Sequence, residues 1–277
     1  MSIINAIILG ILQGLTEFLP VSSSGHLVLM QKIFGITEPT LFFDTMLHVG
    51  TLLAVFTVLW RDIWGILRRI IQPLTLYLII ATIPAVVLAL AFGDVIEHAF
   101  ESGKFLGVCF LITTALLVTA EFLSRRANAS GGLKSGDKMN WVDALIIGIM
   151  QAVAIAPGIS RSGATISGAL SRKLDRDFAA RFSFLLSIPA ILGAVVLQSK
   201  DLIKDDLPST AQAAQSGESI GAAAIIAGTL CAAVVGFFSM KLMLKVIREK
   251  SLFGFAIYTA VLGILVIIDQ TITHFVF

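Results

Sequence analysis

Long apolar segments, separated by short polar ones, occupy almost the whole chain. A helix needs about 20 apolar residues to cross the hydrocarbon core of a bilayer. Six segments reach that length, and they lie at roughly 40–60, 73–92, 104–123, 179–198, 220–244 and 252–270. The pattern therefore predicts an all-α integral membrane protein with six transmembrane helices.

Two other apolar stretches, 2–33 and 141–171, are interrupted near the middle by proline, serine and glycine. The first contains QGLTEFLPVSSSGH (13–26), and the second contains QAVAIAPGISRSGA (151–164). Each half of either stretch is too short to span a bilayer, so each stretch predicts a re-entrant helical hairpin that enters and leaves on one side. Irregular backbone at membrane depth is tolerated only where protein buries it or where it lines a cavity.

Composition agrees with this class of protein. Hydrophobic residues make up 57% of the chain and charged residues only 14%, whereas a soluble domain carries about 25% charged residues. The formal net charge of +2 is too small to indicate a nucleic-acid partner. We therefore expect the chain to be surrounded by membrane lipids and to bind no nucleic acid.

The basic residues divide unequally between the two ends of the predicted spans. Fifteen of the 20 lysines and arginines fall in the segments 61–69, 125–138, 172–181 and 241–250, and four fall at 32, 104, 200 and 204. Cytoplasmic loops carry an excess of Lys and Arg, so the first set predicts the cytoplasmic side. Both termini are then expected outside, as is the polar segment 199–219, interpreted as a loop without evident chemistry.

The two interrupted stretches also match each other in sequence. At a constant offset of 138, the identical pairs are Gly10/Gly148, Ile11/Ile149, Gln13/Gln151, Ser22/Ser160, Ser24/Ser162 and Gly25/Gly163. We predict a first repeat at 1–127, a cytoplasmic linker at 128–139 and a second repeat at 140–277, each repeat with one hairpin and three spans. Because three is odd, the second repeat is inverted relative to the first. Inverted repeats with broken helices place their binding site near the membrane midplane, where the breaks meet.

Polar side chains are costly at membrane depth and mark function there, and both interrupted stretches carry them. Ser160 is expected to cap a helix that starts at Arg161, and the free N–H groups of a helix start favour an anion. The guanidinium of Arg161 adds planar donors that suit phosphate oxygens. The serines 22–24 are expected to begin another helix, which includes His26. The residues expected to bind phosphate are Ser24, Ser160, Arg161, Ser162 and Thr165.

Glu17 and Gln13 lie four residues apart and therefore share one face of a helix. One carboxylate and one amide oxygen beside a phosphate can hold a hard divalent cation, which takes the rest of its ligands from the substrate. With a hydroxyl nucleophile, an imidazole and an anion clamp, this set of residues fits phosphoryl transfer.

These motifs resemble those of the undecaprenyl-diphosphate phosphatase family, the bacitracin-resistance type of membrane phosphatase. The matching elements are an [E/Q]xxxE motif that runs into serines and a histidine, here QGLTEFLPVSSSGH, and PGxSRSxxT, here PGISRSGAT. The resemblance extends over essentially the whole chain. It implies removal of one phosphate from undecaprenyl diphosphate in the bacterial inner membrane, in a site open to the outside that depends on Mg²⁺ or Ca²⁺.

The resemblance also implies a role for each motif residue. Ser23 is expected to be the nucleophile, with Ser22 as the alternative, and His26 is expected to be the essential acid/base. Glu17 is expected to bind the metal or to transfer a proton, and Gln13 occupies the other metal-ligand position, where many relatives have glutamate. Spacing does not decide between the two serines, and direct attack by water is equally compatible with the motifs.

Other interpretations of the same residues stay open. A transporter or lipid flippase could use the same midplane anion site without a nucleophile. Glu17 and Arg161 could form a structural ion pair, and the serines and glycines could be small residues at helix contacts. His48 could line the site, although a packed or interfacial histidine is the preferred interpretation. The run FSFLLSIPA (182–190) either faces the lipid tail or is an ordinary span with a proline kink, and a homo-oligomer is compatible with the sequence.

Overall fold

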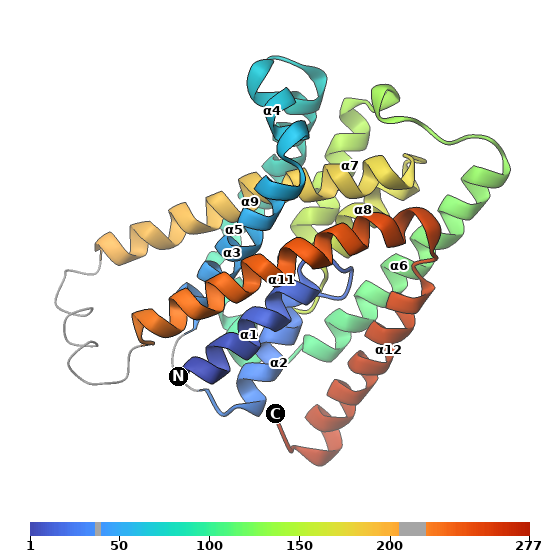
Figure 1. The fold of residues 1–277 in the computed structure, drawn as a ribbon. Coiled ribbons are helices and arrows are strands. Elements are labelled where there is room, and N and C mark those ends of the chain that lie inside the picture. Colours follow the sequence, from blue (N-terminus) through green and yellow to red (C-terminus); the bar gives the residue numbers. More distant parts are fainter. Residues whose placement is uncertain (37–39, 205–219) are drawn as a thin grey trace.

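The structure, a computed structural model, describes residues 1–36, 40–204 and 220–277. These residues are mainly helical (Figure 1), no strand occurs among them, and one isolated bridge pairs Lys134 with Leu174. The helices are α1 (Ile3–Thr16), α2 (Ser23–Ile33), α3 (Leu41–Val58), α4 (Trp60–Arg68), α5 (Pro73–Ser102), α6 (Leu106–Ala129), η1 (Gly136–Lys138), α7 (Trp141–Val153), α8 (Arg161–Ser171), α9 (Arg176–Lys204), α11 (Ala222–Glu249), α12 (Phe253–Ile268) and η2 (Asp269–Thr273).

The six predicted spans are confirmed as the helices α3, α5, α6, α9, α11 and α12, each long and apolar enough to cross a membrane. Two of them differ from their predicted bounds. α5 continues to Ser102 through a non-helical residue, Phe92. α9 continues to Lys204, so the prediction of a loop over 199–219 is wrong for 199–204, and the rest of that segment lies outside the described residues.

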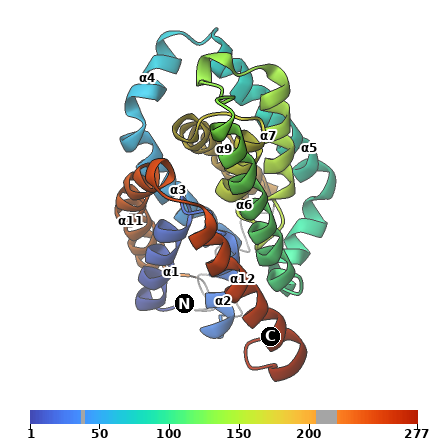
Figure 2. The ribbon, with the colours of Figure 1, turned by 90° about the vertical axis from the view of Figure 1, so that its right-hand side faces the viewer.

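α4 was not predicted, because the segment 61–69 was interpreted only as a basic loop. Its apolar residues Trp60, Ile63, Trp64 and Leu67 recur with the i, i+3, i+4, i+7 spacing of one helix face. No residue of α4 is buried, and the helix lies at the end of the molecule opposite both termini (Figures 1 and 2). Such a short amphipathic helix with two tryptophans suits the interface between a membrane and water.

The two interrupted stretches form the helix pairs α1–α2 and α7–α8, and the members of each pair contact each other. The four helices have 14, 11, 13 and 11 residues, so at about 1.5 Å per residue none is longer than roughly 21 Å. That length is below the ~30 Å of a bilayer core. The re-entrant path of these pairs stays a prediction.

Each short pair packs against a long helix from the other half of the chain. α1 lies on α11, and α7 lies on α5. The contact is close at the repeat-related glycines: a Cβ on Gly10 would collide with the carbonyl oxygen of Gly228, and a Cβ on Gly148 would lie 2.6 Å from the carbonyl oxygen of Ala81. The two halves therefore interlock through equivalent contacts, while their opposite orientation in the membrane stays a prediction.

Candidate active site

The two sequence motifs meet in space, as predicted. The guanidinium of Arg161, the first residue of α8, lies 2.6 Å from the Glu17 carboxylate at the end of α1. The Ser162 hydroxyl donates to the carbonyl oxygen of Leu19, at 3.1 Å. Both contacts join the first motif to the second across the interface between the halves.

A pocket of about 270 Å³ opens beside this junction. Its polar wall comes from the end of α1, the starts of α2 and α8 and one face of α3, and its apolar wall comes from the α7–α8 connection and α9. The lining residues are Glu17, Ser23, Ser24, Leu41, Asp44, Thr45, His48, Ala154, Ile155, Ile159, Arg161, Ala190, Ile191 and Ala194. A pocket with one charged wall and one apolar wall suits a phosphate group attached to a lipid.

Glu17 is the most connected residue of the pocket. Its Oε2 accepts from the Ser23 hydroxyl at 2.6 Å and from the Gln13 amide at 3.0 Å, and its Oε1 accepts from Arg161. The next residue, Phe18, is fully buried and packs edge to face against Phe184 of α9, with ring centroids 5.4 Å apart. This packing holds the backbone that carries the carboxylate.

Ser23 and Arg161 occupy equivalent positions in the two repeats, each as the first residue of its short helix. Ser22 caps α2 by accepting from the Gly25 N–H at 3.2 Å, and Ser160 caps α8 by accepting from the Gly163 N–H at 3.0 Å. The predicted cap at Ser160 is thus confirmed. Both helix starts lie at the pocket, so their free N–H groups and dipoles favour an anion there.

Of the residues expected to bind phosphate, only Ser24 and Arg161 line the pocket. Ser160, Ser162 and Thr165 are each at most 1% exposed. Their hydroxyls are used inside the protein: that of Ser160 caps α8, that of Ser162 bonds Leu19, and that of Thr165 lies 2.6 Å from the Ser183 hydroxyl. The structure therefore places these three where they hold the start of α8, and phosphate contact by them stays a prediction.

Two of the α3 residues that line the pocket are titratable, and sequence reasoning left one of them open and missed the other. His48 Nε2 lies 3.6 Å from Glu17 Oε2, so of the two interpretations of His48 the structure supports the one that places it at the site and not the preferred one. Asp44 also lines the pocket, and its carboxylate accepts from Gln31 at 2.7 Å and Thr40 at 3.2 Å. The available signal was an acid and a histidine four residues apart within an apolar span.

His26 and Ser22 do not line the pocket, although both were expected to act in catalysis. His26 is only 6% exposed, and its ring packs against Phe110 and Tyr258. Ser22 is 2% exposed, and its hydroxyl serves the helix cap. The pocket thus brings together Glu17, Ser23 and Arg161, and the structure leaves His26 behind the start of α2.

The donor set fits a divalent cation that takes further ligands from substrate and water. Among the described residues, no three His, Cys, Asp or Glu side chains could hold a metal alone. The pocket presents the carboxyl groups of Glu17 and Asp44, whose oxygens are the ligands that hard divalent cations take. Gln13 is fully buried behind Glu17, and its Oε1 has no hydrogen-bond partner, so Gln13 as a metal ligand stays a prediction.

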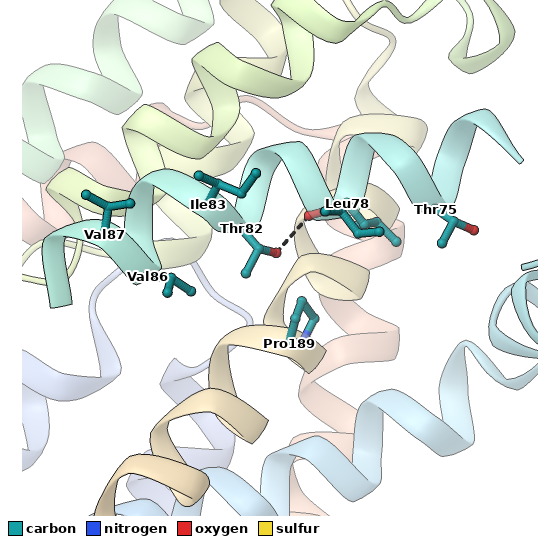
Figure 3. Close-up of a pocket in the computed structure, with 8 residues that line it drawn as sticks. Thr75, Leu78, Thr82, Ile83, Val86, Val87 and Pro189 are labelled. Carbon is teal, nitrogen blue, oxygen red and sulfur yellow. Dashed lines mark hydrogen bonds between the residues drawn. The ribbon is translucent and has the colours of Figure 1, made fainter. Parts of the chain in front are cut away.

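A second cavity, of about 300 Å³, lies between α5 and α9 (Figure 3). Its lining is apolar apart from two threonines, and the hydroxyl of Thr82 is bonded to its own helix at 2.7 Å. Pro189, near the end of the run 182–190, lines this cavity, while the following residues Ala190 and Ile191 line the polar pocket. The apolar cavity offers no group for phosphate chemistry, so the reaction is assigned to the polar pocket.

Fold and site together define a class: an all-helical integral membrane protein with a serine, a carboxylate and an arginine gathered in a half-apolar pocket. The chain belongs to the family described as bacitracin resistance protein BacA, which matches residues 6–265.

The curated relatives cover nearly the full chain. An undecaprenyl-diphosphatase from Carboxydothermus hydrogenoformans is 42% identical over 99% of this chain and 100% of its own length. Undecaprenyl-diphosphatase 3 from Bacillus cereus is 45% identical over 98% of both chains. An undecaprenyl-diphosphatase from Methanosphaera stadtmanae is 39% identical over 97% of this chain and 98% of its own.

Proposed function

We propose that the protein removes the terminal phosphate of undecaprenyl diphosphate and so returns undecaprenyl phosphate to cell-envelope polysaccharide synthesis, with bacitracin resistance as a consequence. Family membership and the names of the relatives support this activity. The observation that carries it in the structure is the Ser23 hydroxyl, which lies 2.6 Å from a carboxylate that is also paired with Arg161. A nucleophile, a base and an anion clamp are the parts that phosphoryl transfer needs.

The geometry favours Glu17 as the proton acceptor for Ser23. The Ser23 oxygen attacks the terminal phosphorus, its proton passes to Glu17 Oε2, and the bond from that phosphorus to the bridging oxygen breaks. Undecaprenyl phosphate leaves with the bonding electron pair. Glu17 passes its proton to the leaving phosphate oxygen and is a carboxylate again. Water then attacks the phosphoserine and gives a proton to Glu17, and the bond from phosphorus to the Ser23 oxygen breaks. Inorganic phosphate leaves, and the proton returns from Glu17 to the Ser23 oxygen. Arg161 and the starts of α2 and α8 stabilise the negative charge of the phosphoryl group throughout.

A divalent cation, Mg²⁺ or Ca²⁺, is part of the proposal because the carboxyl groups of Glu17 and Asp44 line the pocket that must receive an anionic diphosphate. Glu17 and Asp44 would hold the ion, together with phosphate oxygens and water. When bound, the ion supplies positive charge. The protein residues contribute the nucleophile, the proton acceptor and the guanidinium.

The test is phosphate release from undecaprenyl diphosphate by detergent-purified protein, with Mg²⁺, with Ca²⁺ and with EDTA. We expect release with metal and loss of release with EDTA that is restored when metal is added back. Release unaffected by EDTA would contradict the divalent cation. Absence of release under every metal condition would contradict the phosphatase itself.

We also propose that residues 1–127 and 140–277 are inverted repeats, joined by a cytoplasmic linker at 128–139, with re-entrant α1–α2 and α7–α8 and a pocket open to the outer side. The basic segments and the cross-half contacts of Gly10 and Gly148 support this arrangement. Both termini lie at one end of the molecule, and the linker lies at the other (Figures 1 and 2).

Cysteine labelling in cells tests the orientation. In a background with Cys109→Ala and Cys231→Ala, the chain carries no other cysteine. An impermeant maleimide should label His274→Cys in intact cells and Ser135→Cys only after permeabilisation, since both positions are exposed. The reverse pattern would place the termini inside, and labelling of both positions in intact cells would exclude a single orientation.

A further inference from the structure

Both ring nitrogens of His26 are already engaged. Nδ1 lies 2.7 Å from the carbonyl oxygen of Ser22, and Nε2 lies 2.7 Å from the hydroxyl of Tyr258. A carbonyl oxygen only accepts, so Nδ1 carries the proton. In the neutral ring Nε2 therefore accepts from Tyr258, and neither nitrogen faces Ser23 or Glu17.

The backbone that His26 holds has an unusual conformation. Ser22 has φ 71° and ψ 91°, so the chain makes a left-handed turn at this residue, in a region that residues other than glycine rarely adopt. Its carbonyl oxygen accepts twice from His26, once from the backbone N–H at 3.2 Å and once from Nδ1. This turn ends directly at Ser23, whose hydroxyl is thereby directed at Glu17. Such a conformation persists only where its surroundings hold it.

The second repeat provides an internal comparison. Ser160 makes the same cap to Gly163 that Ser22 makes to Gly25, yet Ser160 has φ −69° and ψ 118°, an ordinary extended conformation. At the position equivalent to His26 the second repeat has Ala164. The imidazole and the left-handed turn thus occur together in the motif that carries the nucleophile, and both are missing from the motif that carries Arg161.

Tyr258 holds the imidazole from the other half of the chain. Its ring is parallel to that of His26, with an interplanar angle of 4° and centroids 5.6 Å apart, and Phe110 packs edge to face on His26 at 5.5 Å. The histidine is therefore fixed by a hydroxyl and two aromatic rings, from α6 and α12.

We propose that His26 and Tyr258 are positioning residues: they hold the left-handed turn at Ser22 and thereby aim the Ser23 hydroxyl at Glu17 and the phosphate. This proposal rests on the proposed phosphatase function and assigns the proton transfer to Glu17 alone. It predicts that phosphate release needs a hydrogen-bond donor at the position of Nδ1 but does not need an imidazole that gains and loses a proton.

His26→Asn separates the two roles, because its amide nitrogen can replace Nδ1 as a donor to Ser22 but cannot transfer protons at neutral pH. We expect kcat of His26→Asn to stay within about tenfold of wild type, and that of His26→Ala to fall at least about tenfold further. Tyr258→Phe keeps the ring and loses one hydrogen bond, so kcat should fall about fivefold with KM and the shape of the pH profile unchanged. Tyr77→Phe, at the chain's other tyrosine on α5, is the matched control and should match wild type.

Equal loss in His26→Asn and His26→Ala, with both proteins folded, would overturn the proposal, because it is the result expected of an acid/base. An altered pH profile in Tyr258→Phe would overturn it as well. If His26→Ala does not fold, the activities of His26→Asn and Tyr258→Phe still distinguish a positioning role from an acid/base role. Wild-type release in the same assay establishes the phosphatase independently, so failure of the positioning role and failure of the function are distinguishable.

Discussion

Replacement of Ser23 by alanine is expected to lower phosphate release on the order of 10³-fold or more, with the protein still folded in detergent. The reason is that Ser23 is the one pocket hydroxyl in hydrogen-bond contact with Glu17, at 2.6 Å, among the residues described. Removal of a covalent nucleophile leaves only binding and charge stabilisation. The measurement is kcat for undecaprenyl diphosphate, beside thermal unfolding of each variant.

Ser24→Ala is the matched control for this result. Ser24 lines the same pocket, but its hydroxyl lies 3.4 Å from that of Ser22 rather than on the carboxylate. We expect less than a tenfold loss in this variant, since its hydroxyl could at most bind phosphate. Activity of Ser23→Ala above about a tenth of wild type would favour direct attack by water, and so would the absence of phosphoserine at Ser23 after acid quenching during turnover.

Arg161→Lys is the second variant with a large expected effect. Lysine keeps the charge but loses the planar donors that join Glu17 at 2.6 Å and the carbonyl oxygen of Ser183 at 3.0 Å. We expect kcat/KM to fall about 100-fold, comparable to the loss of one preorganised donor to a charged transition state. Arg172→Lys is the control, because Arg172 pairs with buried Asp143 at 2.7 Å away from the pocket, and it should retain activity.

A paired substitution distinguishes a phosphate clamp from a structural ion pair. Either single change, Glu17→Gln or Arg161→Gln, leaves one charge at the junction without its partner, which is destabilising. The double variant should recover much of the lost thermal stability and none of the activity. If the double variant recovers phosphate release, the ion pair of Glu17 and Arg161 has only a structural role.

The spans and the short helices were predictable, because hydropathy is a local property of the sequence. The meeting of Glu17 with Arg161 was predictable because the two motifs that carry them match each other at a constant offset. Ser23 stood out for the same reason. The place of Asp44 and His48 in the pocket was not predictable. The two residues lie four positions apart and share a helix face, but nothing local says whether that face turns to the pocket.

The position of the His26 side chain could not be predicted from the sequence either. Its partner Tyr258 lies 232 residues away, and only the packing of α12 beside α6 decides where the imidazole points. The helix α4 was missed because its two arginines and its aspartate concealed the spacing of its apolar residues. Long-range packing therefore decides the position of His26, whereas α4 was a local pattern that its charged residues hid.

The interlocking of the halves imposes an order on biosynthesis. α1 packs on α11, and Gly10 fits only against Gly228, which is made about 220 residues later. At roughly 5–20 residues per second, the first helix waits about 10–40 seconds for this partner. For about the first two thirds of that interval Arg161 has not yet been made, so the Glu17 carboxylate lacks its guanidinium partner. The pocket lining extends to Ala194, so the pocket is assembled only after α9 has been made.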